Sequence, residues 1–408
     1  TVSSPQEIEE ELRFLFAFVQ GADDLFFLQG SAGGTLFNLI QLVEKYCPGE
    51  GHALTAALMA GGEPSITAIQ GYELMELARI AAADTPALAW LRRPDRTGAE
   101  WPRELAEDSP FRRAFAGFLQ RYGHRGVYET YLRSPRWREA PDYLLDSVVN
   151  LIGCDPAHLR KRQQQAVAEA WQRLRRDMPF WLRPVVGKLV KASRIECNHR
   201  EAARSALVAY LEVLRRGACT LGQRLAGPRG LEQPDDIFNL TEWEVFALAE
   251  GRLPAAAARR RVAERGYRLE AWATETEPEV LLKHGDAAPT PAAVSASVEN
   301  SKGGIWRGTA VGSGRARGSV HIARHPADGL AMAAGDVLVT PSTDPSWTPL
   351  FLKAGALVME TGGYLSHGAI VAREFGIPAV VNLPGILNHL QNGEQVEVDG
   401  NQGMVRRL

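Results

Sequence analysis

The sequence is poor in cysteine and lysine, and each shortage argues against a class of protein. Only seven of the 46 basic residues are lysines, and the formal net charge of −2 favours neither nucleic acid nor an anionic membrane as a partner. The few cysteines are far apart and form no C-x-x-C pair: Cys47, Cys154, Cys197 and Cys219. This spacing indicates neither a zinc site nor a disulfide framework, so we predict no metal site.

Long apolar runs are also missing. None approaches the roughly 18 residues of a membrane-spanning helix, and the first residues lack the basic and apolar pattern of a secretory signal. We therefore expect a cytoplasmic protein without a membrane partner. The chain begins without methionine, and we expect it to be a piece of a longer enzyme or one of its subunits.

Helical periodicity runs from about residue 6 to 272. Glu7 to Val19 has apolar residues three and four positions apart, which predicts an amphipathic helix. Arg200 to Gly217 repeats the pattern, with Gly217 as the predicted helix end. We predict a large, mostly helical domain over residues 1–273.

The composition changes twice after this region. Residues 274–304 are rich in Ala, Thr, Pro, Ser and Glu and have the composition of a flexible linker. Short β-rich runs then alternate with Gly, Pro and Asp turns, at 319–323, 336–340, 355–359, 377–381 and 395–398. They predict a small α/β domain over 305–408, so the fold class is multidomain, α followed by α/β.

One stretch of this small domain indicates chemistry. A buried strand at Ala356 to Met359 is followed by a glycine pair, and a helix is predicted to begin near Ser366. His367 then lies in the first turn, where free backbone N–H groups and the helix dipole favour a phosphate. Neutral imidazole is a nucleophile near pH 7, and Thr361 or Ser366 would orient the ring or bind the phosphate. The alternative is a histidine that only caps or packs the helix.

The stretch resembles the phosphohistidine swivelling domain of the phosphoenolpyruvate-utilising enzymes. The matching positions are Gly362, Gly363, Ser366, His367, Ala372, Arg373, Glu374, Gly376, Pro378 and Ala379. The upstream run from Thr343 to Pro349 is similar to the same family. The resemblance implies that His367 takes up and passes on a phosphoryl group, and that Thr361, Gly362, Gly363 and Ser366 form its loop.

Domain order indicates the branch of the family. About forty residues follow His367, too few for the barrel of the synthases and dikinases, and a helical region precedes it. This order is similar to that of rifampin phosphotransferase. The run from Tyr122 to Glu129, with Arg125 and Glu129, also resembles its substrate domain, which makes these two residues weaker candidates for substrate binding; the alternative is a structural role in the loop.

Arg200, Glu201 and Arg204 resemble the family run that supplies the phosphoryl-transfer site, with Arg204 where relatives carry lysine. Read from the residues alone, Arg200 and Arg204 are one turn apart and can face one phosphate, and Glu201 can accept a hydroxyl proton or hold an arginine. The alternative is a solvated helix face. A cavity lined by aromatic residues would hold a bulky acceptor, although such residues more often form the core: Phe14, Phe18, Phe26, Phe27 and Phe37.

The resemblance implies ATP and Mg²⁺ as phosphoryl source, bound by an ATP-grasp domain that this sequence lacks. We expect that domain as a partner, in the same longer chain or as a separate subunit, with no cofactor bound by this chain itself. The predicted function is transfer of phosphate from His367 to a hydroxyl of a small molecule, as in antibiotic modification. Two alternatives stay open: a ligase-like activating enzyme of secondary metabolism, and a non-catalytic phosphocarrier or regulatory module.

Overall fold

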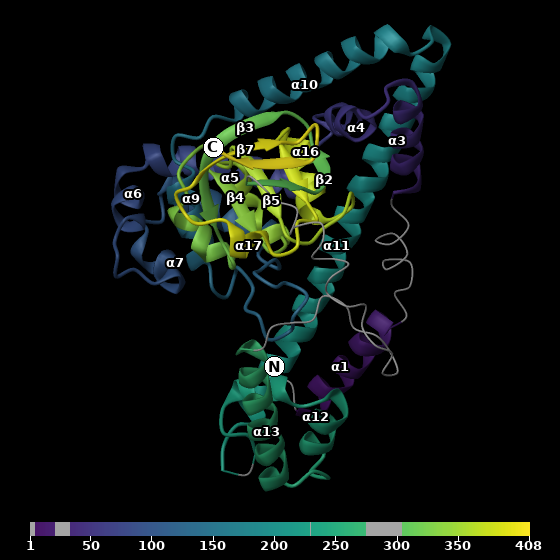
Figure 1. The fold of residues 1–408 in the computed structure, drawn as a ribbon. Coiled ribbons are helices and arrows are strands. Elements are labelled where there is room, and N and C mark those ends of the chain that lie inside the picture. Colours follow the sequence, from purple (N-terminus) through teal and green to yellow (C-terminus); the bar gives the residue numbers. More distant parts are fainter. Residues whose placement is uncertain (1–4, 21–32, 229, 275–303) are drawn as a thin grey trace. The chain divides into compact units, whose positions relative to one another are not determined.

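The computed structural model describes residues 5–20, 33–228, 230–274 and 304–408 (Figure 1). The chain forms two compact units. Unit 1 comprises Thr1–Phe26, Tyr128–Pro135 and Ala206–Ala288, and unit 2 comprises Phe27–Val127, Arg136–Ser205 and Pro289–Leu408. The predicted linker lies almost wholly outside the described residues, so the domain boundaries at 273 and 305 stay predictions.

Unit 1 is helical. Its elements are α1 (Pro5–Gln20), the end of α11 (Arg183–Leu225), η3 (Pro234–Asn239), α12 (Glu242–Ala249) and α13 (Ala255–Thr274). Its apolar core includes Leu12, Leu214, Leu221 and Phe246. Thr241 begins α12 with a capping box, because its side chain accepts a bond from Glu244 N–H while Glu244 bonds back to the Thr241 N–H.

The predicted helix end at Gly217 is wrong. Helix α11 continues to Leu225. A Cβ at position 217 would lie 2.7 Å from the Leu12 side chain of α1. The glycine therefore serves close packing of two helices, which sequence reading cannot distinguish from a C-terminal stop.

Unit 2 begins with helices that surround an aromatic core, which includes Phe111, Phe115, Phe118 and Trp137. These elements are α3 (Gly34–Tyr46), α4 (Gly51–Met59), α5 (Ile66–Ala83), α6 (Thr85–Leu91), η1 (Gly98–Glu100), α7 (Trp101–Glu104), α8 (Pro110–Tyr122), α9 (Asp142–Asn150), α10 (Pro156–Asp177), η2 (Phe180–Leu182) and the start of α11. The predicted helical class of this region is confirmed for its described residues.

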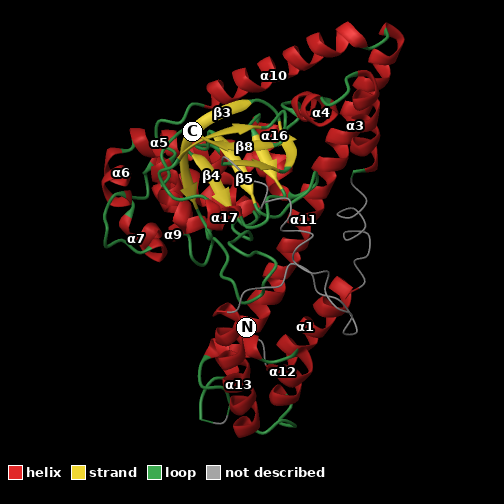
Figure 2. Cartoon of the chain, in the orientation of Figure 1, coloured by secondary structure: helices red, strands yellow, loops and turns green. Residues whose placement is uncertain are grey.

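The rest of unit 2 is an eight-stranded mixed sheet in the order β1-β8-β7-β3-β4-β5-β6-β2 (Figure 2). The strands are β1 (Ile305–Arg307), β2 (Thr309–Gly312), β3 (Arg315–Ile322), β4 (Val337–Thr340), β5 (Ala356–Met359), β6 (Ala379–Val381), β7 (Gln395–Asp399) and β8 (Met404–Arg407). Strands β3 to β6 pair in parallel and the others antiparallel. The central strands β4, β5 and β6 are buried along their whole length, which explains their continuous apolar sequences.

Five short helices complete this part: η4 (Pro326–Ala331), η5 (Pro345–Trp347), α15 (Thr348–Phe351), α16 (His367–Phe375) and α17 (Ile386–His389). Helix α16 ends at Gly376, which adopts the left-handed conformation with φ 65°. Phe351 and Phe375 share one apolar core with residues of α5, α8 and α9. Within unit 2, the α/β part and the helices are therefore packed on a common core.

Candidate phosphoryl-transfer site

His367 is the first residue of α16, as predicted. Ser366 is the N-cap: its Oγ accepts a hydrogen bond from the Ala369 N–H at 3.4 Å and donates one to the Gly363 carbonyl at 2.9 Å. The cap and the preceding loop therefore hold the start of the helix. The His367 side chain itself is buried, with 3% of its surface exposed.

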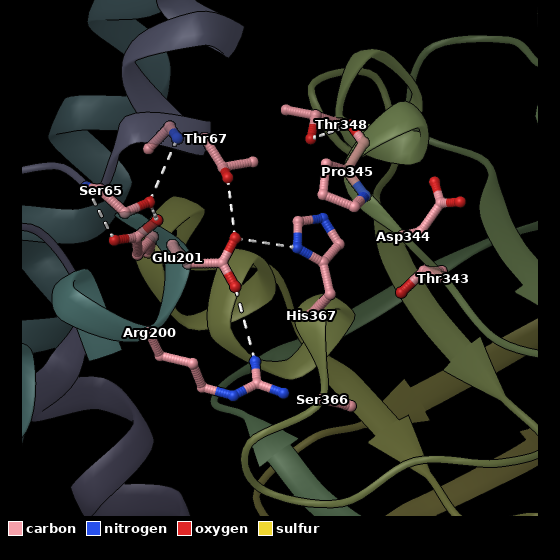
Figure 3. A network of polar contacts seen from close by, with 12 residues as sticks. Ser65, Thr67, Arg200, Glu201, Thr343, Asp344, Pro345, Thr348, Ser366 and His367 are labelled. Atoms are coloured by element: carbon pink, nitrogen blue, oxygen red, sulfur yellow. Dashed lines mark hydrogen bonds and ion pairs between the residues drawn. The ribbon is translucent and has the colours of Figure 1, made fainter. Parts of the chain in front are cut away.

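The imidazole of His367 is bound through one nitrogen. Its Nδ1 lies 3.2 Å from Oε2 of Glu201, on α11 (Figure 3). The same oxygen accepts a hydrogen bond from the Thr67 hydroxyl of α5 at 2.8 Å. The other carboxylate oxygen, Oε1, forms an ion pair at 3.5 Å with Arg200. Three segments far apart in sequence thus meet at one carboxylate.

Glu201 is ionised in this arrangement. Burial of its carboxyl opposes ionisation, but His367, Thr67 and the Arg125 guanidinium outweigh that effect and lower its pKa to about 2. An ionised carboxylate only accepts hydrogen bonds, so Nδ1 of His367 carries the proton of this contact. In the neutral ring the lone pair is then on Nε2, which is the nucleophilic nitrogen.

Nε2 of His367 is buried, and it has no hydrogen-bond partner within the described ranges. Figure 3 shows it on the side of the ring that faces Pro345 and Thr348. The Phe351 ring stacks near the imidazole, with 6.2 Å between the ring centroids. Nε2 is thus covered in this pose, and a reaction partner reaches it only if the residues packed around the ring move apart.

The predicted loop residues are not equivalent. Thr361 is exposed and its hydroxyl donates to the Pro341 carbonyl at 3.0 Å, so it supports the loop. Gly362 needs its φ of 150° and lies against Met359 and Ser366. Gly363 is exposed, with space around its Cα. Of these loop residues, Ser366 lies nearest to His367, because it precedes His367 directly and caps the helix that His367 begins.

The other predicted residues divide between the units. Arg200 and Glu201 meet at the site, and the half-buried Arg204 follows one turn later on α11. Arg125 is fully buried and its charge acts on Glu201. Glu129 is buried in unit 1. The geometry therefore groups Arg125 with Arg200 and Glu201 in unit 2.

The sequence did not predict two residues of the site: Thr67, which contacts Glu201, and Phe351, which contacts His367. A pattern did exist for the first of them: Pro64 and Ser65 before an apolar run predict a helix start, where side-chain hydroxyls face outward to polar partners. Which partner they meet is decided about 134 residues later in the chain. Phe351 lies in an apolar run, and no local pattern indicates that it contacts His367.

Two of the cavities among the described residues differ in the character of their walls. One, in unit 2, has a volume of about 620 Å³ and mixed walls that include Tyr72, Arg160, Arg194 and Glu374. The other, in unit 1, has about 300 Å³ and apolar walls that include Phe16. Of the aromatic residues predicted to line a cavity, Phe14 and Phe37 are exposed, and the side chains of Phe18, Phe26 and Phe27 lie outside the described residues.

Across the residues with described positions, no group of three or more His, Cys, Asp or Glu side chains is arranged to hold a metal ion. No helix in the described ranges is both long and apolar enough to span a membrane.

Comparison with known proteins identifies two segments. Residues 28–201 match the family described as the rifampicin phosphotransferase fourth domain, and residues 332–403 match the PEP-utilising enzyme mobile domain. The first segment ends at Glu201 and the second contains His367. The two residues that form the central contact of the site thus come from the two matched segments.

Individual relatives align over most of the chain. Rifampicin phosphotransferase of Streptomyces sviceus is 28% identical over 378 residues, which cover 90% of this chain and 42% of that protein. An uncharacterized protein of Mycobacterium tuberculosis is 31% identical over 347 residues, 85% of this chain and 37% of that protein. The prodigiosin synthesizing transferase PigC of Serratia marcescens is 29% identical over 423 aligned positions, 99% of this chain and 46% of that protein. The chain spans less than half the length of these relatives.

Proposed function

We propose, on the premise that this chain is a rifampicin phosphotransferase-like relative of the phosphoenolpyruvate-utilising enzymes, that it carries a phosphoryl group on His367 to a hydroxyl of a small molecule. The observation that carries the proposal is the contact between Nδ1 of His367 and Glu201. It leaves Nε2 as the nitrogen that bonds to phosphorus. The acceptor binds in the helical part of the chain.

In the transfer step, the bond between phosphorus and Nε2 breaks as the acceptor oxygen bonds to phosphorus. The electron pair of the broken bond stays on Nε2 and leaves a neutral ring with its proton on Nδ1, and the proton lost by the hydroxyl passes to solvent. Glu201 holds the Nδ1 proton throughout and fixes the ring orientation. Its pKa near 2 is too low for a general base at neutral pH, which supports orientation rather than proton removal.

The arginines complete the proposed site. Arg200 pairs with Glu201 at 3.5 Å yet keeps 23% of its side chain exposed, so its guanidinium can also reach a phosphate at the edge of the site. Arg204 is one helical turn away and carries the same charge, and Arg125 adds a buried positive charge. We assign these residues to binding and charge compensation of the transferred group.

The phosphoryl source in this proposal is ATP with Mg²⁺, bound by an ATP-grasp domain in the same longer chain or in a separate subunit. The greater length of the relatives supports a further domain. His367 has to leave the enclosed pose to be charged, since its Nε2 is fully covered there. Movement of the 305–408 domain on residues 274–304 would supply this step.

The proposal is tested by retention of label. The chain is incubated with β-labelled ATP, alone and with an ATP-grasp domain from a relative, and analysed for acid-labile, alkali-stable phosphate. We expect label on native protein and none on His367→Ala, with exposed His389→Ala as the matched control. Absence of label under every pairing would refute the carrier function.

A second function is favoured by the similarity to PigC, named as a prodigiosin synthesizing transferase. In this second function, the phosphoryl group on His367 activates a substrate for condensation and does not remain on the product. The two functions differ in product: a stable phosphate ester in the first and a phosphate-free condensation product in the second. Mass spectrometry of the product distinguishes them. A phosphocarrier without catalysis would retain label that no acceptor removes.

A further inference from the structure

Helix α16 is attached to the rest of unit 2 at both of its ends. His367 is at the first position, and Glu374 is seven residues later, about 10 Å along the axis. The Glu374 carboxylate accepts a hydrogen bond from the Ser65 hydroxyl at 2.6 Å on Oε2 and one from the Ser65 backbone N–H at 3.1 Å on Oε1. Ser65, with 1% of its surface exposed, is the N-cap of α5.

The start of α5 holds both attachments. Ser65 binds Glu374, and two residues later Thr67 donates to Glu201, which in turn accepts from His367. The N-terminus of α5 has free N–H groups and a positive dipole end, both suited to a carboxylate. Two contacts separated along one helix fix its position and its rotation, whereas the His367 contact alone would leave rotation free.

Helix α10 adds a third contact at the same end of α16. The Gln163 side chain donates to the Glu374 carbonyl and, at 3.1 Å, to the Tyr72 hydroxyl. Arg162 donates to the Phe375 carbonyl at 3.2 Å. These carbonyls are among the last of α16, which lack partners inside the helix. Residues outside 305–408 therefore complete the end of the carrier helix.

We propose that Glu374 is a positioning residue, by which the 305–408 domain recognises the start of α5 and so brings His367 into register with Glu201. Ser65 and Gln163 form the receiving surface. This inference rests on the proposed function, in which the domain docks and departs. Glu374 itself does not touch the transferred group, and its effect on the chemistry is exerted through the position of α16.

The titration of Glu374 agrees with such a contact. Burial raises its pKa to about 7, the charge of Glu201 adds to the rise, and the Ser65 hydrogen bonds and Arg373 oppose it. Arg194, Tyr72 and Cys197 also face this carboxyl from α11 and α5. Docking in this pose is thus favoured when Glu374 holds a proton.

The proposal is tested by the reactivity of His367 toward diethyl pyrocarbonate, which modifies accessible imidazole nitrogens. Nε2 is fully covered in the docked pose, so modification requires undocking. We expect Glu374→Ala and Ser65→Ala to raise the modification rate of His367 about tenfold, with exposed His389 unchanged as an internal standard. Because both substitutions act on the same contact, their effects in the double variant should be less than additive.

Two controls separate docking from general loosening. Ser109 is the N-cap of α8, another helix of unit 2, so Ser109→Ala should lower stability as a lost cap does without raising His367 reactivity. Glu397 pairs with Arg317 and Arg406 on the sheet, and Glu397→Ala should have no effect on His367 reactivity. If Glu374→Ala does not fold, Ser65→Ala tests the same contact from the other side.

Equal His367 reactivity in native protein, Glu374→Ala and Ser65→Ala would overturn the proposal, and so would additive effects in the double variant. The measurement needs neither ATP nor an acceptor. A protein that never takes up labelled phosphate but shows the expected reactivity would refute the phosphoryl function and keep the docking contact. A protein that takes up labelled phosphate but shows equal His367 reactivity in all variants would refute the docking contact alone.

Discussion

Two carboxyl groups that accept hydrogen bonds from the start of α5 have pKa values shifted in opposite directions. Glu201 accepts a hydrogen bond from Thr67, and Glu374 accepts two from Ser65, yet the pKa of Glu201 is lowered to about 2 and that of Glu374 is raised to about 7. Both are desolvated by burial. The difference lies in their partners. The His367 ring, the Thr67 hydroxyl and the Arg125 guanidinium favour the ionised form of Glu201. At Glu374 the hydrogen bonds from Ser65 and the charge of Arg373 do not offset burial. Glu201, which contacts the first residue of α16, therefore stays ionised near neutral pH. Glu374, near the other end of α16, gains or loses a proton in that range.

The largest expected effect is at the histidine end. His367→Ala removes the only atom that we assign to carry phosphate, so label should fall to background, at least 100-fold below native protein. Glu374→Gln, at the other end, should keep label within a few-fold of native. Acid-labile phosphate on each protein measures this. Equal loss in both variants would abolish the proposed division between the two ends.

Glu201→Gln tests the role of the ionised Glu201 carboxylate. It keeps the size of the side chain but removes the anion that holds the Nδ1 proton of His367, so phosphoryl transfer should slow by about 100-fold. Transfer from labelled protein to an acceptor, with rifampicin as the first probe, measures the effect. Thr67→Val, which removes one supporting hydrogen bond, is the graded control and should slow transfer less. A Glu201→Gln protein of native rate would show that Glu201 does not orient the ring.

The pH dependence of stability tests whether Glu374 gains and loses its proton near neutral pH. A carboxyl whose pKa rises from 4.5 to about 7 on folding binds more protons in the folded state, so stability falls as pH rises through that interval. Native protein should lose about 2 kcal/mol between pH 5 and pH 8 relative to Glu374→Gln, which carries no such proton. Glu201 acts in the opposite sense: its contribution is complete above pH 4.5 and is lost as pH falls toward 2. Denaturant unfolding at several pH values measures both, and parallel curves for native and variant protein would contradict the assignment.

The smallest effect concerns two glycines beside His367. A Cβ at Gly368 would lie 2.5 Å from the Thr343 hydroxyl and 2.8 Å from the Met359 sulfur, whereas a Cβ at Gly363 meets nothing within 4 Å. Gly368→Ala should therefore destabilise the protein by about 1–3 kcal/mol, and Gly363→Ala should be nearly neutral. Thermal unfolding compares them. Equal melting temperatures would show that the start of α16 is not tightly packed against Thr343.

Local sequence was sufficient for the elements around the site. The strand at 355–359 and the start of the helix near Ser366 were predicted closely, since a buried parallel strand is continuously apolar and Ser366 is the cap of the helix. Strands β1, β2 and β8 were not predicted, because they are short and lack a long apolar run. The helix end predicted at Gly217 was wrong. A glycine lies there because the Leu12 side chain packs against it, and Leu12 is too distant in sequence to appear in a local pattern.

By itself, the sequence determined that the C-terminal part is α/β with a histidine at the start of a helix, and that helices precede it. These are consequences of periodicity, caps and a motif within some twenty residues. Only the tertiary structure decided that Glu201 meets His367 across 166 positions and that Ser65 meets Glu374 across 309. Hydrogen bonds of this kind depend on packing between distant segments, and the charge that each carboxyl finds there sets its pKa.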